Sequence, residues 1–334
     1  MTEPQLLDAL HEESAEQDVP GFRKKRDLCR DMLLGGSGVY HVAHYTSGVL
    51  DFAVDLLAHE SAPPAVDGAD LRQRRDIHRR VGAQIVYRAT ELNRRLWELQ
   101  SGALIRLVAQ TGDGLVFCNS VVGSEHVVGF GAVPGTTSAG APADPAQVSV
   151  IDRAASGLAT ELRRLMRQRS QNPGGWLTAE TPPEPRTPAD DTVQPHLSGS
   201  TGPGGIFAAA LRPAGLHYLS HHRTGEQVAA VDILAHPELA PFFNRGITVA
   251  DRRSRYRRLA ADLSLLVLQV SRDLRRAVTG DVARLVLDVE MGAVYYTRLS
   301  ADDYLFGVTL DQDSVSQADH ALWTVGRQLV EPTA

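Results

Sequence analysis

Cysteine is scarce in this chain, and signals for export or membrane insertion are lacking. Only Cys29 and Cys118 among 334 residues are cysteines, and their wide spacing argues against a disulfide framework or a zinc finger. The first residues are acidic and polar, with no signal-peptide core. No apolar run approaches the roughly 20 residues that a membrane-spanning helix needs. We therefore expect a protein of the reducing cytoplasm that does not span a membrane.

An excess of basic residues is also lacking. The chain has 34 Lys and Arg against 40 Asp and Glu, which gives a net charge of −6. This balance offers no electrostatic reason to expect nucleic acid as a partner. The hydrophobic content of 43% is ordinary for a globular protein, and a chain of this length normally makes two or three domains.

Motifs for catalysis and for cofactor binding are absent. No Gly-x-Ser-x-Gly elbow is present, and the glycines at 35–38 lack the lysine and the preceding strand of a phosphate-binding loop. Cys118 lies in an expected strand, where a buried and inert thiol is the usual role. The histidines do not converge with other metal ligands, so we expect them at surfaces or interfaces: His41, His44, His217, His221 and His222. We predict no catalytic, cofactor-binding or metal-binding residue.

An internal repeat is the strongest signal in the sequence. Residues 79–132 align without a gap to the residues 178 positions later, with 12 identities in 54 positions. The identities include Arg106, which aligns with Arg284, and Gly114, which aligns with Gly292. Upstream, after a change of length, Gly48 is aligned with Gly215 and residues 38–40 with 205–207. A tandem architecture follows, because each copy is one supersecondary unit.

Hydrophobic periodicity and turn residues predict the same order of elements in each copy. The order is strand, strand, long helix, three strands and a closing helix, which gives an α+β fold with two copies of a five-stranded antiparallel sheet flanked by helices. Helices are expected at 5–15, 22–34, 71–100, 148–169, 249–278 and 315–330. Strands are expected at 39–45, 49–57, 103–109, 115–121, 126–133, 206–211, 216–222, 282–289, 293–298 and 304–310, and an insertion at 226–249. The domains are a helical arm at 1–34, a first repeat at 35–170, a flexible Pro/Gly-rich linker at 171–202 and a second repeat at 203–334.

This order of elements, with turn glycines at Gly48, Gly102, Gly114, Gly280 and Gly292, resembles the Roadblock (dynein light chain) family, which has a profilin-like fold. The resemblance covers most of the chain and implies a non-enzymatic scaffold or regulator of small Ras-like GTPases, including polarity and motility GTPases in bacteria. Family members dimerise through their long helices and sheet edges. The resemblance therefore implies a pseudo-dimer within this chain or a homo-oligomer, and a role in assisting GTP hydrolysis by a partner is compatible with it.

The long helices carry more apolar residues than one buried stripe requires, which predicts an interface between them or with another chain. The predicted interface residues are Tyr87, Leu96, Trp97, Leu265, Leu266 and Leu268. Leu266→Glu is the substitution that this pattern suggests as a test.

Arginines open both long helices, where positive charge is unfavourable with the helix dipole. Those at matching places are candidates for contacts with an acidic partner: Arg75, Arg79, Arg80, Arg253, Arg257 and Arg258. The alternative is that they are solvated and paired with nearby acids such as Asp70, Asp76 and Asp251.

Three functions remain open at this point. The first is the interaction scaffold that the resemblance implies. The second is a small-ligand sensor, whose mark would be a roomy apolar pocket with a few converging polar groups. The third is an enzyme of unknown chemistry, which no set of nucleophile, base or metal-ligand residues in the sequence supports.

Overall fold

The computed structural model describes residues 3–14, 20–133, 144–179, 195–199, 204–243 and 246–330. The strands are β1 (His11–Ser14), β2 (Val39–Thr46), β3 (Val49–Asp55), β4 (Leu104–Gln110), β5 (Gly114–Ser120), β6 (Glu125–Ala132), β7 (His196–Gly199), β8 (Tyr218–Arg223), β9 (Glu226–Asp232), β10 (Arg284–Val289), β11 (Ala293–Arg298) and β12 (Asp303–Thr309). The α-helices are α1 (Glu3–Ala9), α2 (Pro20–Leu34), α3 (Leu71–Leu96), α4 (Ser149–Leu165), α5 (Trp176–Ala179), α6 (Gly204–Ala210), α7 (Val249–Leu274) and α8 (Val315–Val330).

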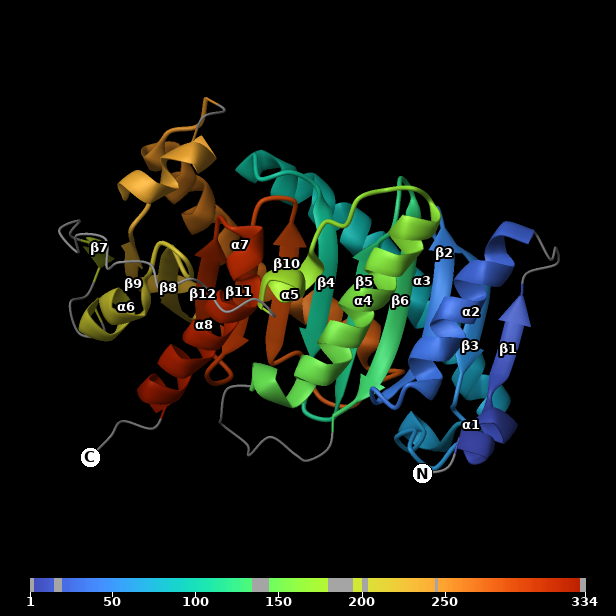
Figure 1. Ribbon diagram of the computed structural model, residues 1–334. Helices are drawn as coiled ribbons and strands as arrows, with labels where there is room; N and C mark the ends of the chain where they lie inside the picture. Colours follow the sequence, from blue (N-terminus) through green and yellow to red (C-terminus); the bar gives the residue numbers. More distant parts are fainter. Residues whose placement is uncertain are drawn as a thin grey trace.

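The strands form a single antiparallel sheet, which counts twelve strands among the described residues (Figure 1). Their order is β1-β3-β2-β6-β5-β4-β10-β11-β12-β8-β9-β7. The α+β class is therefore confirmed, whereas the expectation of two separate five-stranded sheets is corrected to one continuous sheet. Each half of the chain contributes six strands, and β4 and β10 join the halves.

The strand order of the second half mirrors that of the first. Val108 of β4 pairs with Val286 of β10, and the repeat alignment equates the same two residues. A pseudo-two-fold axis therefore passes through this pair. The join also covers one open edge of each half, since β4 and β10 would otherwise present unpaired backbone groups.

Helices cover both faces of the sheet. Figure 1 shows α2, α4, α6 and α8 in front of it, with α3 and α7 behind. One apolar core lies between the sheet and the long helices, and a second lies under the other four. Because the central strands are covered on both sides, β4 is buried along its whole length, and five of its seven residues are apolar.

The two long helices begin in the same way. Asp70 accepts the backbone N–H of Gln73 at the start of α3, and the Gln73 side chain accepts the Asp70 N–H. Thr248 and Asp251 make the same reciprocal capping box at the start of α7. Both helices are 26 residues long. The reciprocal bonds satisfy N–H groups that have no partner within the first helical turn.

The sequence alignment of the first two strands in the second half is wrong. Gly204–Ala210 is a helix, although a strand was expected over 206–211, and the expected insertion begins with strand β9. Gly225 stands in the β8–β9 turn at φ +83°, as Gly48 does in the β2–β3 turn at φ +79°. Gly48 thus corresponds to Gly225 and not to Gly215. The run around 206–211 is short and alanine-rich, and periodicity alone cannot separate a strand from a helix in such a run.

The arm and the linker also differ from expectation where they are described. Residues 11–14 form strand β1 beside β3 instead of continuing a helix. At the start of the predicted linker, residues 173–175 are buried and the Gly174 N–H donates to Asp288 Oδ2 at 2.7 Å. At its far end β7 pairs with β9. These stretches are therefore packed against the rest of the chain, and residues 180–194 and 200–202 lie outside the described residues.

Candidate functional site

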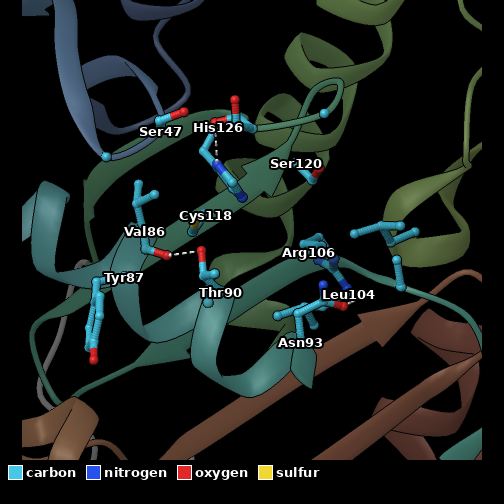
Figure 2. A pocket seen from close by; sticks show the side chains of 16 residues that line it. Ser47, Val86, Tyr87, Thr90, Asn93, Leu104, Arg106, Cys118, Ser120 and His126 are labelled. Carbon is cyan, nitrogen blue, oxygen red and sulfur yellow. Dashed lines mark hydrogen bonds between the residues drawn. The ribbon is translucent and has the colours of Figure 1, made fainter. Parts of the chain in front are cut away.

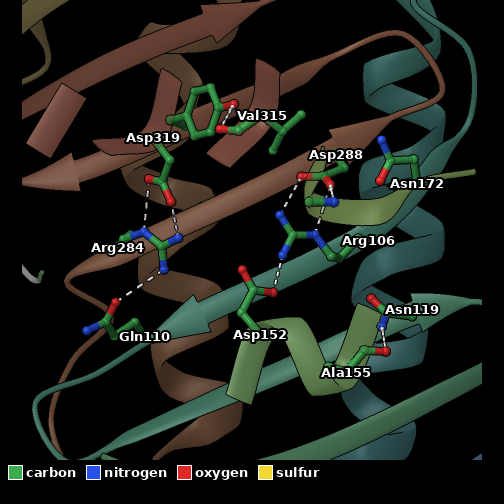
Figure 3. Close-up of polar contacts among 12 residues, drawn as sticks. Arg106, Gln110, Asn119, Asp152, Ala155, Asn172, Arg284, Asp288, Val315 and Asp319 are labelled. Atoms are coloured by element: carbon green, nitrogen blue, oxygen red, sulfur yellow. Dashed lines mark hydrogen bonds and ion pairs between the residues drawn. The ribbon is translucent and has the colours of Figure 1, made fainter. Parts of the chain in front are cut away.

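A buried polar network lies at the join between the two halves (Figure 3). Arg106 of β4 donates from Nε and Nη2 to the Asp288 carboxylate at 2.9 and 3.0 Å, and from Nη1 to Asp152 of α4. Arg284 of β10 donates to the Asp319 carboxylate of α8, and its Nη1 donates to Gln110 Oε1 at 3.2 Å. The network is pseudo-symmetric, except that Gln110 stands where the other half has Asp288.

This network joins the two halves of the chain through ion pairs and hydrogen bonds. Burial opposes the charge on Arg106, but the carboxylates of Asp152 and Asp288 outweigh that effect and raise its pKa. Asp288 also accepts the Gly174 N–H and a bond from Gln312. Each oxygen of Asp288 therefore accepts at least one hydrogen bond, so this buried carboxylate has no unsatisfied oxygen.

Four of the six arginines predicted for an acidic partner are paired within the chain. Arg75 binds the buried Asp55, and Arg253 binds Asp232 at the equivalent place. Arg79 and Arg80 both pair with Asp76, and Arg79 also reaches Glu13. These four arginines therefore form ion pairs within the chain. Asp76, which was named from the sequence, pairs with two of them, and the other acids were not named.

Arg257 and Arg258 differ from their counterparts in the first half. Both are exposed, and neither has an acid within 4.0 Å in the described part of the chain. The reason lies in the sequence, since Ser254 stands where the first half has Asp76. Positive charge is thus left open at the start of α7.

The six predicted interface residues divide into two groups. Leu96 and Leu266 are buried in the core between the sheet and the long helices. Tyr87, Trp97, Leu265 and Leu268 are exposed, at 69%, 65%, 64% and 41%. The repeat alignment equates Tyr87 with Leu265, so an exposed apolar side chain recurs at the same place on both long helices.

The helices α3 and α7 lie against each other, so their exposed residues belong to one face of the molecule. Arg88 of α3 donates to Asp273 Oδ2 at 3.0 Å and to Gln269 Oε1 at 3.0 Å on α7. Part of the contact between the helices is therefore polar. We refer to Tyr87, Trp97, Leu265, Leu268, Arg257 and Arg258 together as the helix face.

A cavity of about 530 Å³ lies between α3 and the sheet of the first half (Figure 2). This volume is within the roughly 300–1,000 Å³ range of small-molecule sites. Its walls are mainly apolar and come from α3, from β4, β5 and β6, and from two hairpin turns: Ser47, Gly48, Val86, Tyr87, Ala89, Thr90, Asn93, Ala103, Leu104, Ile105, Arg106, Cys118, Ser120, Gly123, Ser124 and His126. Sequence analysis named none of these as a ligand-binding residue.

The chemical groups in the cavity wall are uncharged or already paired. Burial raises the pKa of the Cys118 thiol to about 12, so the thiol stays protonated and is a poor nucleophile. Burial lowers the pKa of His126, which keeps its imidazole neutral at pH 7. Asn93 Oδ1 accepts the Leu104 N–H at 2.8 Å. The arrangement can bind a neutral molecule.

The cavity exists because two residues of the first half are smaller than their counterparts. The repeat alignment equates Cys118 with Tyr296 and His126 with Tyr304. In the second half these two tyrosine rings lie 5.2 Å apart, and both are buried between the sheet and α7. The aligned sequence therefore already contains the difference in side-chain size. That difference indicates a cavity only when the fold shows that these positions lie next to each other.

A second polar cluster lies between β2, β3, β6 and α2. His44 Nδ1 is 2.7 Å from Asp51 Oδ2, and its Nε2 is 3.3 Å from Glu125 Oε2. Lys25 Nζ of α2 is 2.5 Å from the same Glu125 oxygen. His44 and Lys25 together lower the pKa of Glu125 to about 2.

Glu125→Gln should lower the free energy of unfolding at pH 7 by on the order of 2 kcal/mol. Because the folded-state pKa of Glu125 is depressed, its stabilisation is present above the usual value near 4.3 and is lost as pH falls toward 2. Urea unfolding at pH 7, 5 and 3 should show the difference from wild type shrinking at the lowest pH. A difference that stays constant across this range would contradict the assignment.

Comparisons with family models, with curated proteins and with solved structures find no match to this chain. Within the described residues, no group of three or more His, Cys, Asp or Glu could hold a metal ion. None of the described helices combines the length and the apolar character needed to cross a bilayer.

Proposed function

We propose that this chain is a tandem Roadblock-like interaction protein, a non-enzymatic scaffold or regulator whose partner is a small Ras-like GTPase. The observation that carries the proposal is the helix face, which joins exposed apolar side chains to two arginines that have no acidic partner among the described residues. Exposed apolar groups of this kind mark sites of protein interaction. The open positive charge favours a partner with an acidic rim.

The mirrored order of strands supports the Roadblock-like part of the proposal. Each half has the core order of a five-stranded sheet, β3-β2-β6-β5-β4 and β9-β8-β12-β11-β10. The family dimerises through sheet edges and long helices, and here β4 and β10 make such an edge contact within one chain. The pseudo-dimer uses that edge internally, so the outer side of the paired helices is the surface left for a partner.

Leu265→Glu combined with Leu268→Glu should weaken partner binding while leaving the fold intact, since both side chains are exposed. The measurement is biolayer interferometry with purified Ras-like GTPases from the source genome, each loaded with GDP or with a non-hydrolysable GTP analogue. We expect binding to weaken at least 30-fold, or about 2 kcal/mol, as for a hot spot. Leu266 is buried, so Leu266→Glu would disrupt the core and is unsuitable as a probe.

The matched control is Leu197→Glu, a charge placed on an exposed leucine of the edge strand β7, which is not part of the helix face. It should leave binding unchanged. Equal binding by wild type and by the Leu265/Leu268 variant, with unchanged melting temperatures, would rule out the helix face as the docking site. A complete lack of binding by all Ras-like GTPases tested would count against the choice of partner class.

A further inference from the structure

We propose that the cavity of the first half binds an uncharged aromatic molecule with a hydroxyl group, of the phenol class. In the second half, Tyr296 and Tyr304 fill the equivalent region. Cys118 and His126 leave that region partly empty in the first half. This inference is tested separately from the proposed docking of a GTPase, because the cavity shares only Tyr87 with the helix face and the measurement is a different one.

The second half shows how a phenol is accommodated in this fold. The Tyr304 hydroxyl donates to the backbone carbonyl oxygen of Ala260 on α7 at 2.8 Å. Its ring stacks on His222, with centroids 5.0 Å apart and planes at 7°. The space between the sheet and a long helix is therefore suited to flat rings, with backbone carbonyls of the helix available to hydroxyl groups.

Part of the same space in the first half is filled by another tyrosine. Tyr45 enters from β2, packs against Gly82 and donates its hydroxyl to the Arg79 carbonyl oxygen at 2.9 Å. Gly82 corresponds to Ala260, whose carbonyl oxygen accepts the Tyr304 hydroxyl in the second half. The ring of Tyr45 therefore occupies the space that the hydroxyl end of the Tyr304 ring occupies there. The remaining volume lies further along α3, from Val86 to Asn93. The cavity is thus the portion that no side chain of the first half fills.

The polar groups around the cavity select against charge. Arg106 contributes to the wall, but its guanidinium is held by two carboxylates and has no capacity to neutralise an anion. His126 is neutral, and Cys118 remains a thiol. A charged ligand would lose hydration without gaining a counter-ion, which costs several kcal/mol.

Neutral hydrogen-bonding groups remain available. Within the described residues, Asn93 Nδ2 and the Ser120 hydroxyl have no hydrogen-bond partner, and both residues line the cavity. Thr90 donates its hydroxyl to the Val86 carbonyl oxygen at 3.0 Å and keeps its own lone pairs for a donor. A phenolic hydroxyl can donate to Thr90 or accept from Asn93 while its ring contacts Val86, Ala89 and Leu104.

The test uses 4-methylphenol, the side chain of tyrosine as a free molecule, titrated into the full chain by calorimetry. We expect one site per chain with a dissociation constant between about 10 µM and 1 mM, as befits eight non-hydrogen atoms in a mostly apolar cavity. The anion 4-hydroxybenzoate should bind at least tenfold more weakly. Failure of 4-methylphenol to saturate at 10 mM, or tighter binding of the anion, would overturn the proposal.

Three variants locate the site. Cys118→Tyr gives the first half the ring that the second half has and should weaken binding at least tenfold. Cys118→Ala keeps the cavity open and should change binding less than about threefold. Tyr296→Cys should leave the first site unaltered. Binding by a folded Cys118→Tyr protein at the wild-type affinity would place the ligand elsewhere and refute the assignment.

A second readout does not depend on the folding of any variant. Cys118 lies in the cavity wall, whereas Cys29 is a buried residue of α2 in the core on the opposite face of the sheet. In the wild-type protein, 4-methylphenol should slow the reaction of Cys118 with methyl methanethiosulfonate at least threefold, and peptide mass mapping can follow each thiol. Cys29 serves as the internal control. An equal change at both thiols, or none at Cys118, would contradict binding in this cavity.

Discussion

Arg106→Ala should lower the free energy of unfolding by about 3–5 kcal/mol, because it leaves buried carboxylates without their cation. Arg106 is fully buried, and it binds both Asp152 and Asp288. The change also removes one of the two arginine side chains that span the join between the halves. Equilibrium unfolding in urea at pH 7 measures the loss, with circular dichroism as the signal.

The pseudo-symmetric Arg284→Ala is the matched control. Arg284 is equally buried, but it neutralises one carboxylate, Asp319, and its other partner is the neutral Gln110. Its loss should therefore cost less than the loss of Arg106. If the two variants were equally unstable, the second carboxylate would not matter, and the electrostatic account of the join would be wrong.

Gly292→Ala should destabilise the protein by about 3–5 kcal/mol, through backbone strain and a steric clash together. Gly292 lies between β10 and β11 with φ at +92°, which side-chain-bearing residues rarely adopt. A Cβ atom there would also collide with the carbonyl group of Thr309 on β12, which is backbone and cannot rotate away. Thermal and urea unfolding of the variant measure the cost.

Gly225→Ala separates the two contributions. Gly225 has a similar φ of +83° in the β8–β9 turn, but no atom lies within 4 Å of the position that its Cβ would occupy. The control should lose only about 1 kcal/mol, the cost of the backbone conformation. A loss at Gly225 as large as that at Gly292 would show that the clash with Thr309 contributes nothing.

The aligned glycines show how far a repeat in the sequence can be interpreted. Gly114 and Gly292 are equivalent in sequence, and both were predicted as turn residues. Only Gly292 has positive φ, whereas a Cβ at Gly114 would meet the Val278 side chain. Both copies have glycine at this position, but the physical reason that glycine is needed differs between them because each glycine has different neighbours.

The sequence by itself determined the features that depend on near neighbours along the chain. The long helices follow from helical periodicity, and the capping boxes follow from side chains three residues apart. The ungapped alignment over 79–132 already equated Arg106 with Arg284 and Cys118 with Tyr296. The α+β class followed from the order of these elements. The short strand and helix around 204–232 were misassigned, because local apolar runs of that length do not distinguish the two.

Only the tertiary structure decided what depends on contacts between distant residues. The pairing of β4 with β10 merges two expected sheets into one, and it places Arg106 opposite Asp288, 182 positions away. The same packing buries Leu266 and leaves Leu265 exposed. It also leaves a cavity beside Cys118, where the second half has a tyrosine. Pairing register and unfilled volume are properties of packed surfaces, and no local pattern of residues specifies them.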